Sequence, residues 1–218
     1  MSYILKNPEA VLGLLLEHLQ MTGLAVVIAI AIALPLSLLV TYYPRLNVPI
    51  VGLLGILYTI PSLALIILLV PIFVLTSQSV IVAMVIYCQA ILVRNFSVAL
   101  QSIPPAILEA ASGMGMNVWQ RWWQVQVPLI LPIFLAGVRL ATIVAIAIAT
   151  IGAKFGAGGL GVLLFDGVSQ SRNDKIVVGA IAVAVLAFAI NGILLGLEWL
   201  SSPERKIRQA SRANVGFS

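Results

Sequence analysis

The chain has 218 residues, of which 61% are hydrophobic and only 9% charged, and its mean hydropathy is +1.14. About a quarter of the residues in a soluble domain are charged, so this composition excludes a soluble protein and indicates about five membrane spans of roughly 20 residues each. The net charge of +5 does not indicate nucleic acid as a partner, because four basic residues follow the last apolar segment, where they meet lipid headgroups: Arg205, Lys206, Arg208 and Arg212.

The first 19 residues are mixed in character, and we interpret residues 1–19 as an interfacial amphipathic segment that leads into the first span. Residues 20–200 then form one all-α membrane domain, with an insert at 101–127 and a Gly-rich, then polar, segment at 152–175. The expected spans lie at about 20–41, 49–71, 78–100, 128–151 and 176–199, and a basic tail occupies 201–218.

The distribution of Lys and Arg predicts the orientation of these spans. With the C-terminus in the cytoplasm, the inner side holds Arg45, Arg94, Arg121 and the four basic residues of the tail. The outer side then holds Lys6, Lys154, Arg172 and Lys175. The excess of positive charge inside favours an external N-terminus, and it places the insert at 101–127 in the cytoplasm.

The insert is polar and helix-forming, although it stands between two membrane-length apolar segments. Pro104-Pro105 suits the first turn of a helix, Gly113 and Gly115 allow a sharp turn, and a second short helix is expected from Val118 to Gln126, with Pro128 restarting the next span. We expect a compact element of two short helices at an angle. An alternative is an interfacial hairpin whose three tryptophans lie among the lipid headgroups.

The residues of the insert carry a family resemblance. Glu109-Ala110-Ala111, three residues, Gly115, nine residues and Val125-Gln126-Val127-Pro128 resemble the E-A-A-x3-G-x9-I-x-L-P coupling loop of ABC importer permeases of type I, with valines in place of Ile and Leu. The resemblance implies the type I permease fold and a multi-pass protein of the bacterial plasma membrane. It further implies that a separate ATPase, which binds ATP and Mg, docks on five residues: Glu109, Ala110, Ala111, Gly115 and Pro128.

Further segments resemble permeases for glycine betaine, carnitine and choline. They are Thr59-Ile60-Pro61-Ser62, Val93-Arg94-Asn95, Gly113-Met114-Gly115-Met116 followed by Trp119-Gln120-Arg121-Trp122, and Gly156-Ala157-Gly158-Gly159-Leu160-Gly161. The family works by alternating access, with a second permease subunit, identical or different, and an extracytoplasmic solute-binding protein. Permeases for amino acids or thiol compounds share this scaffold. From the sequence alone, a secondary transporter or channel without an ATPase, or a structural membrane scaffold, also remains open.

A candidate translocation path includes Tyr58, Thr59, Pro61 and Ser62, because Pro61 frees a backbone carbonyl that we expect near the bilayer midplane, where Thr59 or Ser62 can satisfy it. A simple packing kink is the alternative. Arg139 is a second candidate, since a charge within the bilayer faces either a carboxylate or the path, or else extends to the headgroups.

The glycines Gly156, Gly158, Gly159 and Gly161 match a dinucleotide-binding pattern literally, but the membrane span before them excludes that site. We interpret them as a close-packed turn at the outer mouth, and packing alone is the alternative. His18 is the only histidine and is expected at the membrane edge, and Cys88 is the only cysteine. With these residues no metal site is expected, and without a phosphate loop the chain binds no ATP itself.

Overall fold

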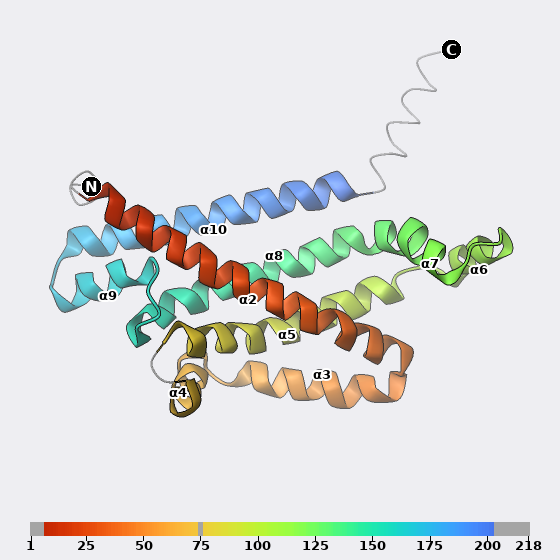
Figure 1. Cartoon of the computed structure of the whole chain (residues 1–218), viewed down its shortest axis with the longest axis horizontal. Coiled ribbons are helices and arrows are strands. Elements are labelled where there is room, and N and C mark those ends of the chain that lie inside the picture. Colours follow the sequence, from red (N-terminus) through yellow and green to blue (C-terminus); the bar gives the residue numbers. More distant parts are fainter. Residues whose placement is uncertain (1–6, 74–75, 203–218) are drawn as a thin grey trace, which may run out of the picture.

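The computed structural model describes residues 7–73 and 76–202, and within these ranges every regular element is a helix. Long helices run back and forth along one bundle, and shorter ones lie at its two ends (Figure 1). In chain order the elements are α2 (Pro8–Tyr42), α3 (Pro44–Thr59), α4 (Ser62–Phe73), α5 (Ser77–Gln101), α6 (Pro105–Gly113), α7 (Val118–Arg121), the π-helix η1 (Trp122–Gln126), α8 (Val127–Gly152), the 3₁₀ turn η2 (Ala153–Phe155), α9 (Gly161–Ser169) and α10 (Asn173–Ser201).

The membrane-spanning helices agree with the sequence pattern in number. Four helices within the described residues are long and apolar enough to cross a bilayer, and the bent pair α3–α4 makes a fifth if it counts as one span. The fold class is therefore that of an all-α membrane protein. The expected basic tail lies outside the described residues from position 203 onward, as do Lys6 and the rest of residues 1–6.

The N-terminal boundary differs from the expectation. Residues 1–19 were expected to form an interfacial amphipathic segment leading into a first span that begins at about residue 20, but α2 runs without a break from Pro8 to Tyr42. Neither proline nor glycine interrupts residues 14–22, and the helix continues through Thr22, whose hydroxyl bonds the carbonyl of His18. Pro35 lies within α2 and does not end it.

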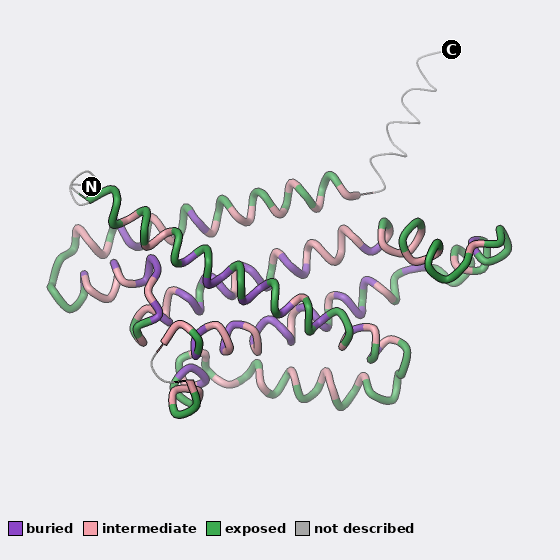
Figure 2. Tube along the Cα trace, viewed as in Figure 1, coloured by how far each residue is buried: buried purple, intermediate pink, exposed green. Residues whose placement is uncertain are grey.

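The core forms where α2, α5 and α8 pack together, and Figure 2 shows their facing sides as buried. The buried positions of α2 lie on one face of the helix, and most of them are small, which lets the helix backbones approach closely. They are His18, Met21, Thr22, Ala25, Val26, Ala29, Ala33, Ser37 and Val40. The amide Nε2 of Gln89 on α5 donates a hydrogen bond to the carbonyl of Ala29 at 3.1 Å and so joins two helices within the core.

The outer helices contribute little to this core. None of the residues of α3 is buried, and only three of α10 are: Val178, Gly179 and Leu186. Both helices therefore present apolar faces outward over most of their length. Such faces suit either lipid or a second membrane subunit.

The elements sort into two ends. The start of α2 lies at the same end as α4 and α9, whereas α6, α7 and the α2–α3 turn lie at the opposite end (Figure 1). Arg45 and Arg121 belong to the latter end, and Lys154, Arg172 and Lys175 belong to the former. The connectivity thus groups these charges as the sequence analysis grouped them.

Candidate functional site: the α6–α7 hairpin and three polar clusters

The α6–α7 hairpin, residues 102–126, has a well-defined turn. At the end of α6, the N–H of Met116 bonds the carbonyl of Ala111 at 3.2 Å, and the N–H of Gly115 bonds the carbonyl of Ser112 at 3.0 Å. Gly115 has φ +78. This pair of bonds around a left-handed glycine is a Schellman motif, which satisfies the last carbonyls of a helix. The turn expected at Gly115 is present, whereas Gly113 is simply the last residue of α6.

The start of α7 is fixed by a capping box that the sequence analysis overlooked. The Oδ1 of Asn117 accepts the N–H of Gln120 at 2.8 Å, and the Oε1 of Gln120 accepts the N–H of Asn117 at 3.0 Å. The signal was present in the sequence, because a capping residue followed three positions later by Gln marks a helix start. Arg121 Nη1 also donates to Ser112 Oγ at 2.7 Å, which ties α7 back to α6.

The hairpin joins α8 directly. Pro128 was expected to restart the next span, yet α7, η1 and α8 form one continuous helical stretch from Val118 onward. Pro128 has no N–H to donate to the preceding turn. The helix accommodates Pro128 by forming a π-helix directly before it, in which the N–H of Val127 donates to the carbonyl of Trp122. The hairpin and α8 are therefore joined by continuous helical backbone.

Not all the expected docking residues reach the surface. Glu109, Ala110, Gly115 and Pro128 are exposed, whereas Ala111 is only 2% exposed and packs inside the hairpin. Several large apolar side chains are exposed on the same element, among them Met114 at 71% and Trp119 at 70%. Leu108 packs inward against Ala99, Ile103 and Ile130, and so anchors α6 on α5 and α8.

The Pro61 break separates α3 from α4 by a bend of 97°. Ile60 is extended, with ψ 127, as expected before proline. Of the carbonyls left at the break, that of Ile56 accepts the Thr59 hydroxyl at 2.7 Å and that of Leu57 accepts the N–H of Ile60 at 3.3 Å.

The bend lies at the end of α3 farther from the α2–α3 turn, because the 16 residues of α3 rise about 24 Å from Tyr43. Tyr58 is exposed beside the bend, and its ring contacts that of Tyr87 on α5, with centroids 5.4 Å apart. The depth of the bend in a bilayer stays a prediction.

Arg139 is paired across two helices. Its Nε lies 3.1 Å from Oε2 of Glu198, and its Nη1 donates to Oδ1 of Asn191 at 3.3 Å, both on α10. The side chains of Arg139 and Glu198 are 24% and 25% exposed, so the pair is largely withdrawn from solvent. Arg139 therefore pairs with a carboxylate, as one of the alternatives predicted, and does not extend to the headgroups. Asn191 and Glu198 are seven residues apart, on one face of α10.

The glycine segment turns sharply after α8. Gly156, Gly158 and Gly159 all have positive φ, between 76 and 80. Oε2 of Glu17 accepts the N–H of Gly159 at 3.0 Å, although the two residues are 142 positions apart. His18 was expected at the membrane edge, but it is fully buried against this turn, because Gly159 has no side chain to keep it away.

These clusters remain separate. Arg139 finds its partners on α10, Tyr58 contacts α5, and the glycine turn contacts α2. Within the described residues, no group of three or more His, Cys, Asp or Glu is placed to hold a metal ion. The arrangement is that of a membrane bundle with a hydrogen-bonded hairpin at one end and a close-packed glycine turn at the other.

Comparison with known proteins identifies the class. A family model described as "Binding-protein-dependent transport system inner membrane component" matches residues 25–198. The chain belongs to this family of permease subunits of binding-protein-dependent importers, and it is a multi-pass membrane protein.

Several similar proteins are permeases for osmoprotectants. The chain is 36% identical over 207 residues to the osmoprotectant import permease protein OsmW of Salmonella typhimurium, which covers 93% of this chain and 96% of that protein. It is 34% identical to the carnitine transport permease protein OpuCB of Listeria monocytogenes, over 89% of this chain and 88% of the other. It is 32% identical to the glycine betaine/carnitine/choline transport system permease protein OpuCB of Bacillus subtilis, over 86% of this chain and 87% of that protein.

Solved structures agree on the fold. A chain of the MetNI methionine ABC transporter in an inward-facing conformation matches with a TM-score of 0.79 at 22% identity, covering 88% of this chain and 96% of that one. A chain from a second crystal form of the same transporter matches with a TM-score of 0.75 at 21% identity, covering 85% of this chain and 93% of that one. The all-α fold of a type I importer permease, expected from the insert, is confirmed.

Proposed function

We propose that the α6–α7 hairpin is the contact through which a separate ATPase, carrying ATP and Mg, drives this permease. The observation that carries the proposal is the continuous helix from Val118 into α8, together with the tie between Arg121 and Ser112. An ATPase that moves the hairpin would move α8 with it. The exposed Glu109, Ala110, Gly115 and Pro128 would face the partner, and Ala111 would support them from inside.

The orientation follows from this assignment. The hairpin end, with Arg45 and Arg121, would face the cytoplasm, and the start of α2 would face outward, as the distribution of positive charge favours. The glycine turn at Gly156–Gly161 would then lie at the outer mouth, where a solute-loaded binding protein docks. The sparsely buried faces of α3 and α10 leave room for a second permease subunit.

The solute would be a quaternary ammonium osmoprotectant such as glycine betaine, carnitine or choline. The support is the similarity of this chain, at 32–36% identity over most of both chains, to permeases named for osmoprotectants, for carnitine and for glycine betaine, carnitine and choline. Aromatic rings attract such cations through their faces. Tyr58, paired with Tyr87 beside the Pro61 break, is therefore the part of the candidate path best suited to them. Thr59, Pro61 and Ser62 would shape that part of the path, and the Arg139 pair would brace α8 against α10.

The ATPase contact is tested by charge reversal. Glu109→Lys should reduce co-purification of the ATPase by at least about tenfold, since a misplaced charge at an interface costs several kcal/mol. The matched control is Glu9→Lys, an equal reversal at an exposed position at the other end of the bundle. Equal retention of the ATPase by both variants would reject the contact.

The solute class is tested in proteoliposomes that contain permease, ATPase and the binding protein. Glycine betaine, carnitine and choline should stimulate ATP hydrolysis, and methionine should not. Stimulation by methionine alone would assign another solute class. Solute flux that needs an ion gradient but no ATPase would establish a secondary transporter and overturn the proposal.

A further inference from the structure

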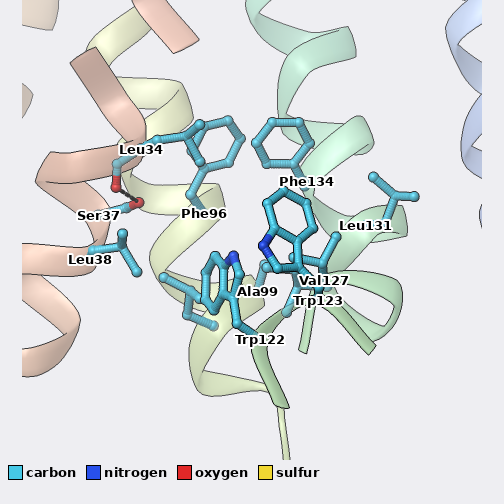
Figure 3. Close-up of a pocket in the computed structure, with 12 residues that line it drawn as sticks. Leu34, Ser37, Leu38, Phe96, Ala99, Trp122, Trp123, Val127, Leu131 and Phe134 are labelled. Atoms are coloured by element: carbon cyan, nitrogen blue, oxygen red, sulfur yellow. Dashed lines mark hydrogen bonds between the residues drawn. The ribbon is translucent and has the colours of Figure 1, made fainter. Parts of the chain in front are cut away.

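We propose that a cavity at the base of the α6–α7 hairpin binds one acyl chain of a membrane phospholipid. The cavity has a volume of about 290 Å³. Figure 3 shows Leu34 and Leu38 of α2 on one side and Trp123, Val127 and Leu131 of η1 and α8 on the other. The volume is close to the lower end, about 300 Å³, of pockets that hold small ligands.

The lining determines the chemistry of the occupant. No charged residue lines the cavity, and apart from Ser37 its side chains are hydrocarbon or aromatic. The Ser37 hydroxyl is already engaged, because it donates to the carbonyl of Leu34 at 2.8 Å. A polar solute would lose its hydration here without compensating hydrogen bonds, and water is not retained in apolar cavities. A hydrocarbon chain has no hydrogen bonds to lose on entry.

Two stacked rings line one end of the cavity. Phe96 of α5 and Phe134 of α8 stack with centroids 4.2 Å apart and planes at 17°. In Figure 3 they stand at the opposite end from Trp122. The occupant would therefore extend from the hairpin end toward these rings, with its terminal methyl group nearest to them.

The open rim is apolar and lies on membrane-spanning helices. Leu34 is 38% exposed and Trp123 is 52% exposed, although both line the cavity. Both belong to helices long and apolar enough to cross a bilayer. The hydrocarbon that surrounds such helices is lipid.

Charge at the hairpin end favours a phospholipid headgroup. Arg121 immediately precedes Trp122, and Arg45 lies in the first turn of α3 at the same end. Cationic side chains attract anionic phosphates at a membrane surface, and tryptophan rings favour the headgroup level. A chain in the cavity would thus leave its phosphate near cationic groups.

The occupant would also contact residues that hold the hairpin. Ala99, Trp122 and Ile130 line the cavity and belong to the cluster that packs Ile103 and Leu108. An acyl chain would therefore be part of the packing between α2 and the base of the hairpin. The inference goes beyond the proposed function and does not depend on the solute or on the ATPase.

The test uses the full-length permease in nanodiscs of phosphatidylglycerol and phosphatidylcholine that carry a photoreactive diazirine on one acyl chain. After illumination, mass spectrometry maps the labelled residues. In the wild-type protein we expect the labels to concentrate on Leu38, Trp122 and Leu131, beyond the labelling of exposed residues of α3 and α10. Labels spread evenly over the exposed helix faces would overturn the proposal, and this result needs no variant.

Two variants sharpen the comparison. Leu38→Trp fills the cavity, whereas Leu39→Trp places the same ring one residue further on α2, at an exposed position outside the lining. Leu38→Trp should reduce labelling of Trp122 and Leu131 by about tenfold. This is the loss in occupancy expected when two methylene groups of the acyl chain are no longer buried in the cavity. Leu39→Trp should leave it unchanged. Equal labelling in the two variants, or capture of a second permease subunit by a photoreactive residue at position 38, would overturn the proposal.

Discussion

Replacing Gly115 by alanine tests whether the hairpin turn is held by backbone conformation alone. Gly115 has φ +78, and a Cβ added there would meet no atom within 4 Å. The cost of Gly115→Ala is therefore the left-handed backbone alone, about 1–2 kcal/mol. The substitution therefore destabilises the closed turn, in which the two hydrogen bonds of the Schellman motif are formed, relative to an open hairpin. We expect amide exchange of residues 114–116 to accelerate by about 5- to 30-fold.

The matched control is two residues away. Gly113 is helical and also has open space around its Cα, so Gly113→Ala should slow exchange or leave it unchanged, because alanine favours a helix by up to about 1 kcal/mol over glycine. Hydrogen exchange with mass spectrometry over residues 105–126 measures both variants in the same detergent. Acceleration of equal size in both would refute the argument from φ, and so would unchanged exchange in Gly115→Ala.

Three further outcomes follow from the polar contacts. Asn117→Ala removes the capping box and should destabilise the hairpin by about 1 kcal/mol, seen as faster exchange at residues 118–121 while that of α10 stays the same. Removal of either Arg139 or Glu198 should lower the thermal stability of the protein. In a double-mutant cycle the double variant should lose less stability than the sum of the two single variants, with a coupling energy of about 1 kcal/mol or more, and additive losses would contradict the pairing. Gly158→Ala places a Cβ 2.5 Å from Oε2 of Glu17 at a residue with φ +80. It should therefore destabilise the protein by more than the backbone cost of about 1–2 kcal/mol. Glu17→Ala should remove the part of the loss that comes from this clash, and thermal unfolding of the single and double variants measures it.

The sequence was most informative where local chemistry decides the conformation. Pro61 ends α3 because it has no N–H and because it keeps Ile60 extended. Gly115 adopts a backbone conformation that costs other residues energy, so its place after a short helical segment predicted the turn. The capping box at Asn117 was equally readable and was overlooked. The continuous helix through Pro128 could not be read, since only the folded chain reveals that a π-helix accommodates the missing donor.

Long-range contacts were decided by the tertiary structure. Glu17 binds the N–H of Gly159, and Arg139 finds Glu198 and Asn191, because packing of helices distant in sequence brings them together. No spacing within the chain records these distances.

The sequence by itself determined a membrane-embedded helical bundle, the ends of most of its long helices and a polar hairpin between two of them. Only the tertiary structure decided which side of each helix is buried, where the charged groups are neutralised and that a cavity lies at the base of the hairpin. The physical reason is that lipid and protein interior are both apolar. A helix that is hydrophobic on all sides carries no mark of which side faces protein, so close packing of small residues makes the choice.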